Sequence, residues 1–377
     1  MKKILIVVPS LAIGGQEKAA VDNAEILKTE FDVKLVLFDK RDVEYETSCD
    51  KIYLNVGASK SKFAKILGQI KRAIKLMSLR RKEKADIVYS FGSGANLTNS
   101  LSGIFSRGKT IVAIHGFEFV RKSALNSFVF KHADKVICIA QAMKDALLKI
   151  YPFLEKKAVL VENGYNIKQI KAKSKEESVL LKSGSPQYIA MGRLDPVKGF
   201  DRLIKAFAMV LKEIPEAQLT IIGVGKLEAS LKEMCEDLKI SGSVNFVGYH
   251  KNPFALLAKA DIFMLSSHSE GFPNAIIEAM TCGVACISVD CMSGPREILC
   301  ESYSDKAICG VVEEKYGVLV EQSDDEEYVA SNLAKAMVIV AKDGELLHKY
   351  KDIGPERAEH FSTDVLKSKL LALFEES

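Results

Sequence analysis

Residues 266–280 read SSHSEGFPNAIIEAM, and this stretch decides how the second half of the chain is interpreted. The apolar run Ile262–Leu265 precedes it and has the composition of a buried strand. A polar turn carrying Glu270 follows, and Pro273 then opens a helical pattern. Proline suits the first turn of a helix because its missing N–H removes no helix hydrogen bond. The stretch therefore predicts a strand, a turn and the start of a helix.

Two carboxylates flank the start of this expected helix. The free amides around Phe272 and Asn274 form an anion site at the positive end of the helix dipole. Glu270 lies before the helix and Glu278 lies one to two turns inside it. One carboxylate can therefore contact the same small ligand as the anion site, and the other can reach the far side of that ligand. A ligand with both phosphate and sugar hydroxyls, such as a nucleotide-sugar, fits this arrangement.

Length and charge suggest a two-domain protein with a basic first half. A chain of 377 residues exceeds one ordinary core and predicts two domains of roughly 170 to 200 residues. Residues 1–171 carry 30 Lys and Arg against 17 Asp and Glu, whereas the remainder carries 23 against 32. A basic half attracts polyanions or an anionic membrane surface, and a solvated lysine-rich face is the alternative.

The first residues imitate a signal peptide, because Lys2 and Lys3 precede the apolar run Ile4–Val8. Pro9 and Gly14 interrupt that run early, so we expect a first buried strand instead. No run of the sequence reaches the roughly 18 apolar residues needed to span a bilayer.

Cysteine usage favours a reducing compartment. The eight cysteines lack the spacing of a secreted disulfide framework. Five of them lie close together and raise the alternative of zinc: Cys282, Cys286, Cys291, Cys300 and Cys309. None forms the C-x2-C pairs typical of zinc sites. We therefore expect no metal, and reduced, mostly buried thiols in the cytoplasm.

Strand-like runs alternate with helical patterns, which indicates α/β domains with doubly wound parallel sheets. In the first half the expected strands are Lys3–Val8, Val33–Phe38, Ile52–Leu54, Asp86–Phe91, Thr110–His115, Lys135–Ala140 and Ala158–Val161. In the second half they are Gln187–Met191, Gln218–Ile222, Val244–Val247, Ile262–Leu265 and Ala285–Val289. The stretch Ile167–Pro186 has no clear apolar period and is the expected linker. Ligands of such sheets sit at the carboxyl ends of the strands, so a cleft between the domains is the expected site.

Two loops of the first half carry candidate ligand contacts. The paired glycines Gly14 and Gly15 allow a close backbone approach to a ligand, although a tight strand-to-helix turn would look the same. His115 ends an apolar strand and is followed by Gly116. A neutral imidazole there can hydrogen-bond a sugar hydroxyl, and a purely structural histidine is the alternative.

In the second half, Met191–Phe200 supplies two cations. Arg193 and Lys198 flank a turn before an expected amphipathic helix at Asp201–Leu211. They can neutralise a diphosphate, the arginine by bidentate contact and the lysine as a point charge. Unrelated surface basics are the alternative. A further turn at Ser293–Ile298 follows the next expected strand and is placed to close a sugar pocket.

The segment Ser59–Ala85 is strongly basic. It carries ten cations and one acid, Glu83. Among the cations, apolar residues recur at helical spacing: Phe63, Ile66, Leu67, Ile70, Ile74 and Met77. A basic amphipathic helix is typical of a membrane-surface element or of a core-packed helix with a cationic outer face, and we expect a combination of the two. Nucleic acid is not expected, because interleaved aromatics and a known binding module are missing.

With these residues in view, the chain resembles the family 4 retaining glycosyltransferases, which have the GT-B fold. The most specific motif is E-G-F-P-N-x3-E at Glu270–Glu278, the family's E-x7-E signature. The G-R-L-x3-K-G segment at Gly192–Gly199 and the G-G-x-E loop at Gly14–Glu17 precede it in the family's order. The resemblance implies an acceptor-binding domain at residues 1–170 and a nucleotide-sugar-binding domain at 171–360. It also implies a helix at 361–377 that packs back on the first domain.

The resemblance also implies roles for individual residues. Arg193 and Lys198 would bind the donor diphosphate, Glu278 the ribose and Glu270 the donor sugar. The other donor contacts would come from the backbone of Gly15, Gly271, Phe272, Pro273 and Asn274, with His115 lining the sugar pocket. Gly14, Gln16 and Glu17 would contact the acceptor. The family's N-G-V-D turn reads Asn163-Gly164-Tyr165-Asn166 here, so its acidic member is absent.

The implied reaction is a retaining sugar transfer without metal or other cofactor, in which fixed cations and amides stabilise the leaving diphosphate. The expected donor is a UDP-hexose or UDP-N-acetylhexosamine, with GDP-mannose next. The expected acceptor is a lipid-pyrophosphate-linked saccharide for a capsule, lipopolysaccharide or similar surface glycan. The enzyme would lie peripherally at the inner face of the cytoplasmic membrane. A nucleotide-sugar epimerase and a non-catalytic nucleotide-sugar-binding protein are the alternatives.

Overall fold

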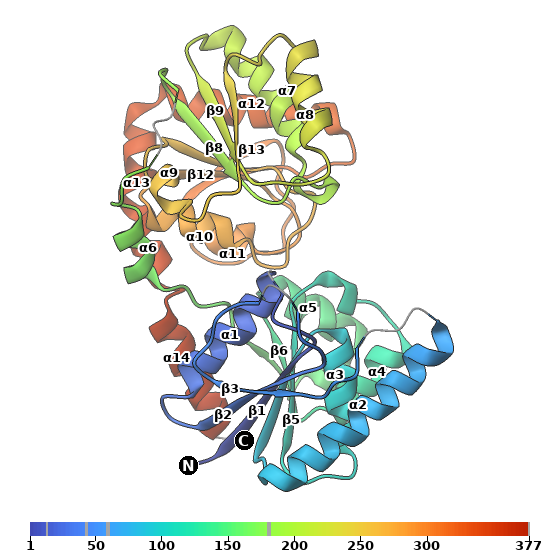
Figure 1. Ribbon diagram of the computed structural model, residues 1–377. Helices are drawn as coiled ribbons and strands as arrows, with labels where there is room; N and C mark the ends of the chain where they lie inside the picture. Colours follow the sequence, from blue (N-terminus) through green and yellow to red (C-terminus); the bar gives the residue numbers. More distant parts are fainter. Residues whose placement is uncertain (13, 42–43, 58–60, 179–181, 376–377) are drawn as a thin grey trace. The chain divides into compact units, whose positions relative to one another are not determined.

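The computed structural model describes residues 1–377 apart from 13, 42–43, 58–60, 179–181 and 376–377. The chain forms two compact units, unit 1 with Met1–Gly164 and Thr363–Ser377, and unit 2 with Tyr165–Ser362. Each unit is a sheet with helices on its faces (Figure 1). The predicted pair of Rossmann-like α/β domains is confirmed.

Unit 1 is built on a parallel seven-stranded sheet with the order β3-β2-β1-β4-β5-β6-β7 among the described residues. Its strands are β1 (Lys3–Val8), β2 (Asp32–Leu37), β3 (Asp50–Tyr53), β4 (Ile87–Phe91), β5 (Lys109–Ile114), β6 (Lys135–Cys138) and β7 (Ala158–Leu160). Its helices are α1 (Gly15–Leu27), α2 (Lys62–Glu83), α3 (Ser93–Gly103), α4 (Ala124–His132), α5 (Gln141–Ile150) and α14 (Thr363–Glu375), with short 3-10 turns η1 (Phe117–Phe119) and η2 (Pro152–Leu154).

The last helix, α14, completes the core of unit 1. Leu366, Leu370, Leu373 and Phe374 of α14 are buried in the same cluster as the apolar residues of β1 and α1. The ring of Phe374 stands edge-on to Tyr89, with ring centroids 5.5 Å apart. Residues from the two ends of the chain therefore share one core.

Unit 2 contains a seven-stranded sheet with the order β10-β9-β8-β11-β12-β14-β13 in the part that the structure describes. Its strands are β8 (Gln187–Met191), β9 (Gln218–Ile222), β10 (Val244–Gly248), β11 (Ile262–Leu265), β12 (Ala285–Val289), β13 (Val311–Glu314) and β14 (Gly317–Val320). Its longer helices are α7 (Phe200–Glu213), α8 (Glu228–Asp237), α10 (Asn274–Thr281), α12 (Glu326–Lys342) and α13 (Gly344–Glu359). The shorter ones are α6 (Ile167–Lys173), α9 (Phe254–Leu257), α11 (Pro295–Leu299) and the 3-10 turn η3 (Pro196–Lys198).

The hairpin β13–β14 was missed from the sequence. Its strands have four residues each, and β13 pairs antiparallel with β14 at the edge of an otherwise parallel sheet. Glu313 and Glu314 interrupt the apolar pattern of β13, so the run lacks the signal of a buried strand. The parallel strands lie within a few residues of their predicted bounds.

The unit boundaries differ from the expected positions, residues 170 and 360. The chain leaves unit 1 after Gly164 and returns to it at Thr363. The two crossing segments are tied together, because the amide of Tyr165 donates to the carbonyl of Phe361 over 2.8 Å. The expected linker Ile167–Pro186 is also wrong at its start, since α6 occupies Ile167–Lys173; residues 179–181 of it lie outside the described ones.

Candidate active site

The candidate site of unit 2 lies where the order of its sheet reverses. β8 pairs with β9 on one side and with β11 on the other. In a parallel doubly wound sheet, the loops after two such central strands leave in opposite directions and open a crevice at the carboxyl edge. The loop after β8 is residues 192–199, and the loop after β11 is residues 266–273. Both motifs that the sequence singled out in this half are therefore at one edge of the sheet.

Lys198 and Glu270 join these two loops. The Nζ of Lys198 lies 2.7 Å from Oε1 of Glu270, which also accepts a hydrogen bond of 2.6 Å from the Ser267 hydroxyl. Only 11% of the Glu270 side chain is exposed, against 25% for Lys198. The pair is thus partly shielded from water and fixes the lysine head group at the carboxyl edge of the sheet.

Arg193 lies on the same loop as Lys198 but in a different setting. Its side chain is 74% exposed, and its Nε lies 2.5 Å from Oδ2 of Asp195. The described contacts do not bring Arg193 and Lys198 together. An exposed arginine on a short loop keeps the rotamer freedom needed to meet an arriving anion.

The start of α10 follows the Glu270 loop. The helix begins at Asn274, and Pro273 is its N-cap residue. The sequence had predicted Pro273 as the first residue inside the helix, so the proline lies one position before the place expected for it. The Ser293 hydroxyl donates to the carbonyl of Gly271 over 2.7 Å, which fixes the backbone before the helix. Phe272 is buried against Phe361 of the same unit.

Two residues of the unusual segment 163–166 have clear roles in unit 2. The Tyr165 hydroxyl donates to Oδ1 of Asn274 over 2.6 Å and so contacts the first residue of α10. The Asn166 side chain accepts from the amide of Gln169 and caps α6. Asparagine is as good an N-cap as aspartate, so the missing acid costs the helix little.

Glu278 lies one turn into α10 and is partly exposed.

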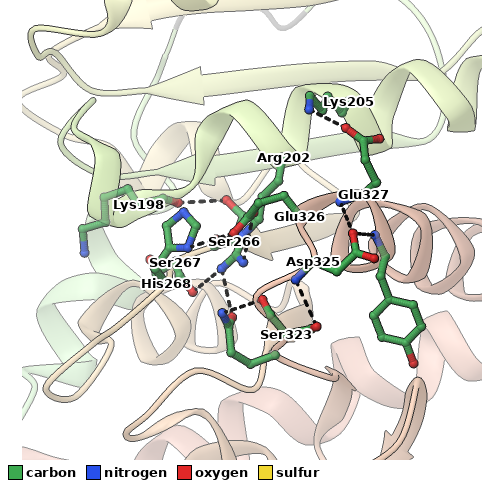
Figure 2. A network of polar contacts seen from close by, with 12 residues as sticks. Lys198, Arg202, Lys205, Ser266, Ser267, His268, Ser323, Asp325, Glu326 and Glu327 are labelled. Atoms are coloured by element: carbon green, nitrogen blue, oxygen red, sulfur yellow. Dashed lines mark hydrogen bonds and ion pairs between the residues drawn. The ribbon is translucent and has the colours of Figure 1, made fainter.

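Arg202 is a residue that the sequence argument missed. It lies in the first turns of α7 and is fully buried. Its Nε and one Nη donate to the carbonyls of Ser266 and Ser267, each over 2.6 Å. Its other Nη lies 3.6 Å from Glu326 at the start of α12, and Figure 2 shows the guanidinium between these elements. Arg202 therefore holds the loop that carries Glu270.

Gly199 shows how closely the two loops approach. Its φ of +61° lies in the left-handed region, and an added Cβ would come within 2.2 Å of the carbonyl oxygen of Ser266. In the same place, the Ser266 hydroxyl donates to the carbonyl of Lys198 over 3.0 Å. This close approach explains why the motif has a glycine after Lys198. For Arg202, the only signal in the sequence was a basic residue at the start of an otherwise apolar helix face.

In unit 1, the glycine-rich loop also lies at a reversal of strand order, between β1 and β4. Gly14 is the N-cap residue of α1 in extended conformation, and Gly15 is its first residue. The side chain of Glu17 reaches back toward Gly14, as in a capping box. The side chain of Gln16 lies against Gly92, which follows β4. These contacts bring the loops after β1 and β4 together at the carboxyl edge of the sheet.

His115 directly follows β5, one residue beyond the strand's end at Ile114. Its ring packs on Phe91 with centroids 5.3 Å apart. Its Nε2 is buried, and no described residue forms a hydrogen bond with it. Burial lowers the pKa of His115 to about 4, so the imidazole is neutral near pH 7. A neutral imidazole is the form expected to hydrogen-bond a sugar hydroxyl, and that contact stays a prediction.

Because the pKa of His115 is lower in the folded protein than in the unfolded chain, stability should fall as the pH drops from about 6.5 toward 4. In this window the unfolded state binds a proton that the folded state does not. Compared with His115→Phe, the wild type should lose on the order of 3 kcal/mol of unfolding free energy by pH ~4. Urea unfolding at a series of pH values measures this difference. His132→Gln, which removes an exposed histidine of the same unit, is the control for the loss of an imidazole. Identical slopes in wild type and His115→Phe would refute the assignment.

Most of the cysteine thiols are buried. Cys49, Cys138, Cys235, Cys286, Cys291 and Cys300 are buried, as expected for most thiols, whereas Cys309 is exposed. Among the described residues, no group of three or more His, Cys, Asp and Glu is placed to hold a metal ion. Within the same residues, no helix combines the length and apolar character needed to cross a bilayer.

Family models match both halves of the chain. The model described as "Glycosyltransferase Family 4" matches residues 13–169, and that described as "Glycosyl transferases group 1" matches residues 171–357. The match therefore includes the loops after β1, β5, β8 and β11 that carry the candidate residues.

Known relatives and structures point the same way. An N-acetylgalactosaminyltransferase of Campylobacter jejuni that acts on N-acetylgalactosamine-N,N'-diacetylbacillosaminyl-diphospho-undecaprenol is 25% identical over 96% of this chain and 96% of its own length. The UDP-Gal:alpha-D-GlcNAc-diphosphoundecaprenol alpha-1,3-galactosyltransferase of Escherichia coli is 25% identical over 84% of this chain and 83% of its own. The fold is similar to that of HepE from Anabaena in complex with UDP and glucose, with a TM-score of 0.75, 17% identity and full coverage of both chains.

Proposed function

Because the chain belongs to the family 4 glycosyltransferases of the GT-B fold, we propose that it transfers a sugar from a UDP-sugar to a saccharide on a lipid pyrophosphate, with retention of anomeric configuration. The observation that carries the proposal is the Lys198–Glu270 pair, which joins the loops after β8 and β11. It places a fixed cation and a carboxylate at the edge of the sheet where ligands of doubly wound folds bind.

The proposed chemistry is stabilisation of a leaving diphosphate. When the bond between the anomeric carbon and the diphosphate breaks, negative charge develops on the phosphate oxygens. Lys198 and Arg193 supply positive charge, and the backbone amides of Gly271, Phe272 and Asn274 supply donors at the start of α10. Fixed donors of this kind replace the charge that a divalent cation supplies in other transferases, so we propose a metal-independent reaction. The departing phosphate accepts the proton of the attacking hydroxyl on the same face, which retains the configuration.

The other contacts of the donor follow from the residues in place. Glu278 binds the ribose hydroxyls and Glu270, oriented by Ser267, contacts the donor sugar. Gly15 and His115, with the acceptor contacts Gly14, Gln16 and Glu17, belong to unit 1, and their part in the site stays a prediction.

Donor and acceptor classes are supported by the names of the relatives. The Escherichia coli relative uses UDP-Gal, and both curated relatives act on saccharides linked to diphosphoundecaprenol. We therefore propose a UDP-hexose or UDP-N-acetylhexosamine as donor and a polyprenyl-diphosphate saccharide as acceptor. The product then belongs to a cell-surface glycan.

A donor screen tests this function. The protein is incubated with UDP- and GDP-sugars and a membrane-lipid extract, and the released nucleoside diphosphate is measured. We expect UDP release that depends on the lipid extract and a product whose anomeric configuration, read by NMR, equals that of the donor. Inversion would overturn the retaining mechanism. Epimerised free nucleotide-sugar without any transfer would instead support the epimerase alternative.

We also propose that α2 binds an anionic membrane surface, which places the enzyme at the inner face of the cytoplasmic membrane beside a lipid-linked acceptor. Five apolar side chains of α2 are 43–72% exposed: Phe63, Ile66, Leu67, Ile70 and Ile74. The inner face of the helix is formed by other residues, with Leu76 fully buried in a core cluster. The exposed cations Lys65 and Lys71 flank the apolar residues and complement a negative surface.

Two other cations of α2 serve the fold instead. Arg72 donates to the carbonyls of Val56 and Gly57, at 2.9 and 2.6 Å, and Lys75 donates to that of Leu54 over 2.6 Å. Reversing these charges would disturb unit 1 and would not test membrane binding. Substitutions of the exposed apolar residues are the cleaner test.

The double variant Phe63→Ser/Ile70→Ser should bind anionic vesicles at least about tenfold more weakly, because each buried apolar side chain contributes roughly 1.5–3 kcal/mol. Vesicle co-sedimentation measures the change. Leu238→Ser removes an exposed apolar side chain of unit 2 and should bind as the wild type does. A double variant that binds normally would remove the proposal, and a wild type that dimerises and ignores vesicles would identify the face as a self-association surface.

A further inference from the structure

A second polar site lies at the opposite edge of the sheet of unit 1 from the loops that carry Gly15 and His115. A hollow of about 1030 Å³ opens where the strands begin, between the last turn of α2 and the segment 104–109 after α3. Six cations line it: Lys2, Arg80, Arg81, Lys84, Arg107 and Lys109. This charge is not explained by the proposed sugar transfer, whose residues lie at carboxyl edges.

The two acids in the wall are already engaged by the backbone. Asp86 accepts a hydrogen bond of 2.8 Å from the amide of Lys3, and Asp134 accepts one of 2.8 Å from that of Thr110. Lys109 lies 3.7 Å from Asp134. Among the described residues, none of the other five cations has a carboxylate within ion-pair distance. The hollow therefore keeps a net positive charge.

Arg80 lines the hollow and is its most deeply buried cation. It is only 2% exposed, and its two Nη atoms donate to neutral acceptors, including the Thr110 hydroxyl and the carbonyl of Gly108. Its Nε is buried and has no hydrogen-bond partner among the described residues. Burial lowers the pKa of Arg80 to about 10, so the guanidinium is still charged at neutral pH. A buried cation without a paired anion is costly, and a ligand anion would offset that cost.

The rim is preorganised and partly apolar. Arg81 donates to the carbonyl of Phe105 over 2.8 Å, which ties the end of α2 to the segment after α3. The side chain of Phe105 itself is 71% exposed. Along α2, Arg81 continues the helical spacing of the exposed Ile70 and Ile74 and so lies on the same face. The apolar face that we propose to contact a membrane thus ends at the cationic hollow.

We propose that this hollow binds a phosphate group. Because the apolar face of α2 adjoins the hollow, we assign that phosphate to the headgroup of an anionic lipid. The choice of a lipid source rests on the proposed membrane binding of α2, whereas the phosphate site itself rests on Arg80 and the unpaired cations. Arginine and lysine side chains around a concave surface match the charge and the donor requirement of a phosphate.

The test compares two kinds of phosphatidylcholine vesicle. One contains phosphatidic acid, and the other contains oleate in the amount that gives the same zeta potential. The wild type should bind the phosphatidic acid vesicles about tenfold more tightly, since charge-assisted hydrogen bonds to phosphate add to the general attraction. The variant Lys84→Asn/Arg107→Gln should bind both vesicles equally. Asparagine is chosen because Lys84 has a φ of +54°.

The matched control is Lys65→Gln/Lys71→Gln, which removes two charges from α2 outside the hollow. It should weaken binding to both vesicles while keeping the preference for phosphatidic acid. Calorimetry with glycerol 3-phosphate separates the sources. If the wild type shows no vesicle preference but binds glycerol 3-phosphate, and Lys84→Asn/Arg107→Gln does not, the site stands with a soluble phosphate as its ligand.

Equal behaviour of the wild type and Lys84→Asn/Arg107→Gln in both assays would overturn the proposal. A wild type that binds no vesicle at all would refute membrane binding by α2, and the glycerol 3-phosphate titration would still decide on the hollow. Sugar transfer to a detergent-solubilised acceptor should be the same in all these variants, because none of their residues belongs to the donor site.

Discussion

Replacing Lys198 by alanine should lower kcat by about 10² to 10³, the range measured when one donor to a developing negative charge is removed. Lys198 is held 2.7 Å from Glu270 at the edge of the sheet, so its charge is in place before the donor arrives. Alanine would remove that charge and also leave the partly buried carboxylate of Glu270 without its cation. The rate of UDP release with the donor found in the screen measures the effect.

Two variants sharpen this test. Lys205→Ala removes another lysine, which lies on α7 and pairs with Glu327 in the first turn of α12, and its kcat should be unchanged. Lys198→Arg keeps the charge but not the shape, so we expect part of the activity to return. A Lys198→Ala enzyme with normal kcat would show that the charge of Lys198 is not used in the transfer step.

Replacing Arg202 by methionine should lower the free energy of unfolding by roughly 2–4 kcal/mol, since each buried carbonyl left without a donor costs about 1–3 kcal/mol. The arginine is fully buried, and methionine fills much of its volume without offering a donor. The carbonyls of Ser266 and Ser267 would then be left without the guanidinium, and Glu326 without its cation. Thermal or urea unfolding measures the loss.

Lys205→Ala is again the reference, because it removes a neighbouring cation of α7 whose partner is exposed. An exposed pair contributes at most about 1 kcal/mol, so this variant should unfold almost as the wild type does. Figure 2 shows the two cations on the same helix, each facing an acid at the start of α12. Similar stabilities of the two variants would mean that Arg202 does not hold the loop after β11.

The parallel strands and the edge that bears the site were predictable from the sequence. Runs such as Ile262–Leu265 are fully buried, and their apolar pattern is strong because both faces of a parallel sheet are covered. Polar loops after such strands must meet at one edge, which is why Lys198 and Glu270 could be assigned to one site although 72 residues separate them.

The sequence was less informative where contacts depend on backbone atoms. Arg202 binds main-chain carbonyls, and such acceptors carry no residue signal. Arg72 looked like part of a cationic outer face, but its guanidinium is used by the carbonyls of residues 56–57. The short edge strand β13 was missed for another reason. It pairs antiparallel with β14 and tolerates glutamates that a central strand would exclude, so its sequence lacks the apolar pattern of a strand.

The discontinuity of unit 1 affects how the protein is made. Leu366, Leu370 and Phe374 belong to the same core as β1, although they leave the ribosome only after all of unit 2. During translation, unit 2 can therefore complete its fold before unit 1, even though most of unit 1 is synthesised first. Until α14 arrives, the apolar surface that it covers stays open to chaperones and proteases. A premature stop codon before Leu366 should thus remove the enzyme by degradation, with the residues of the donor loops still intact.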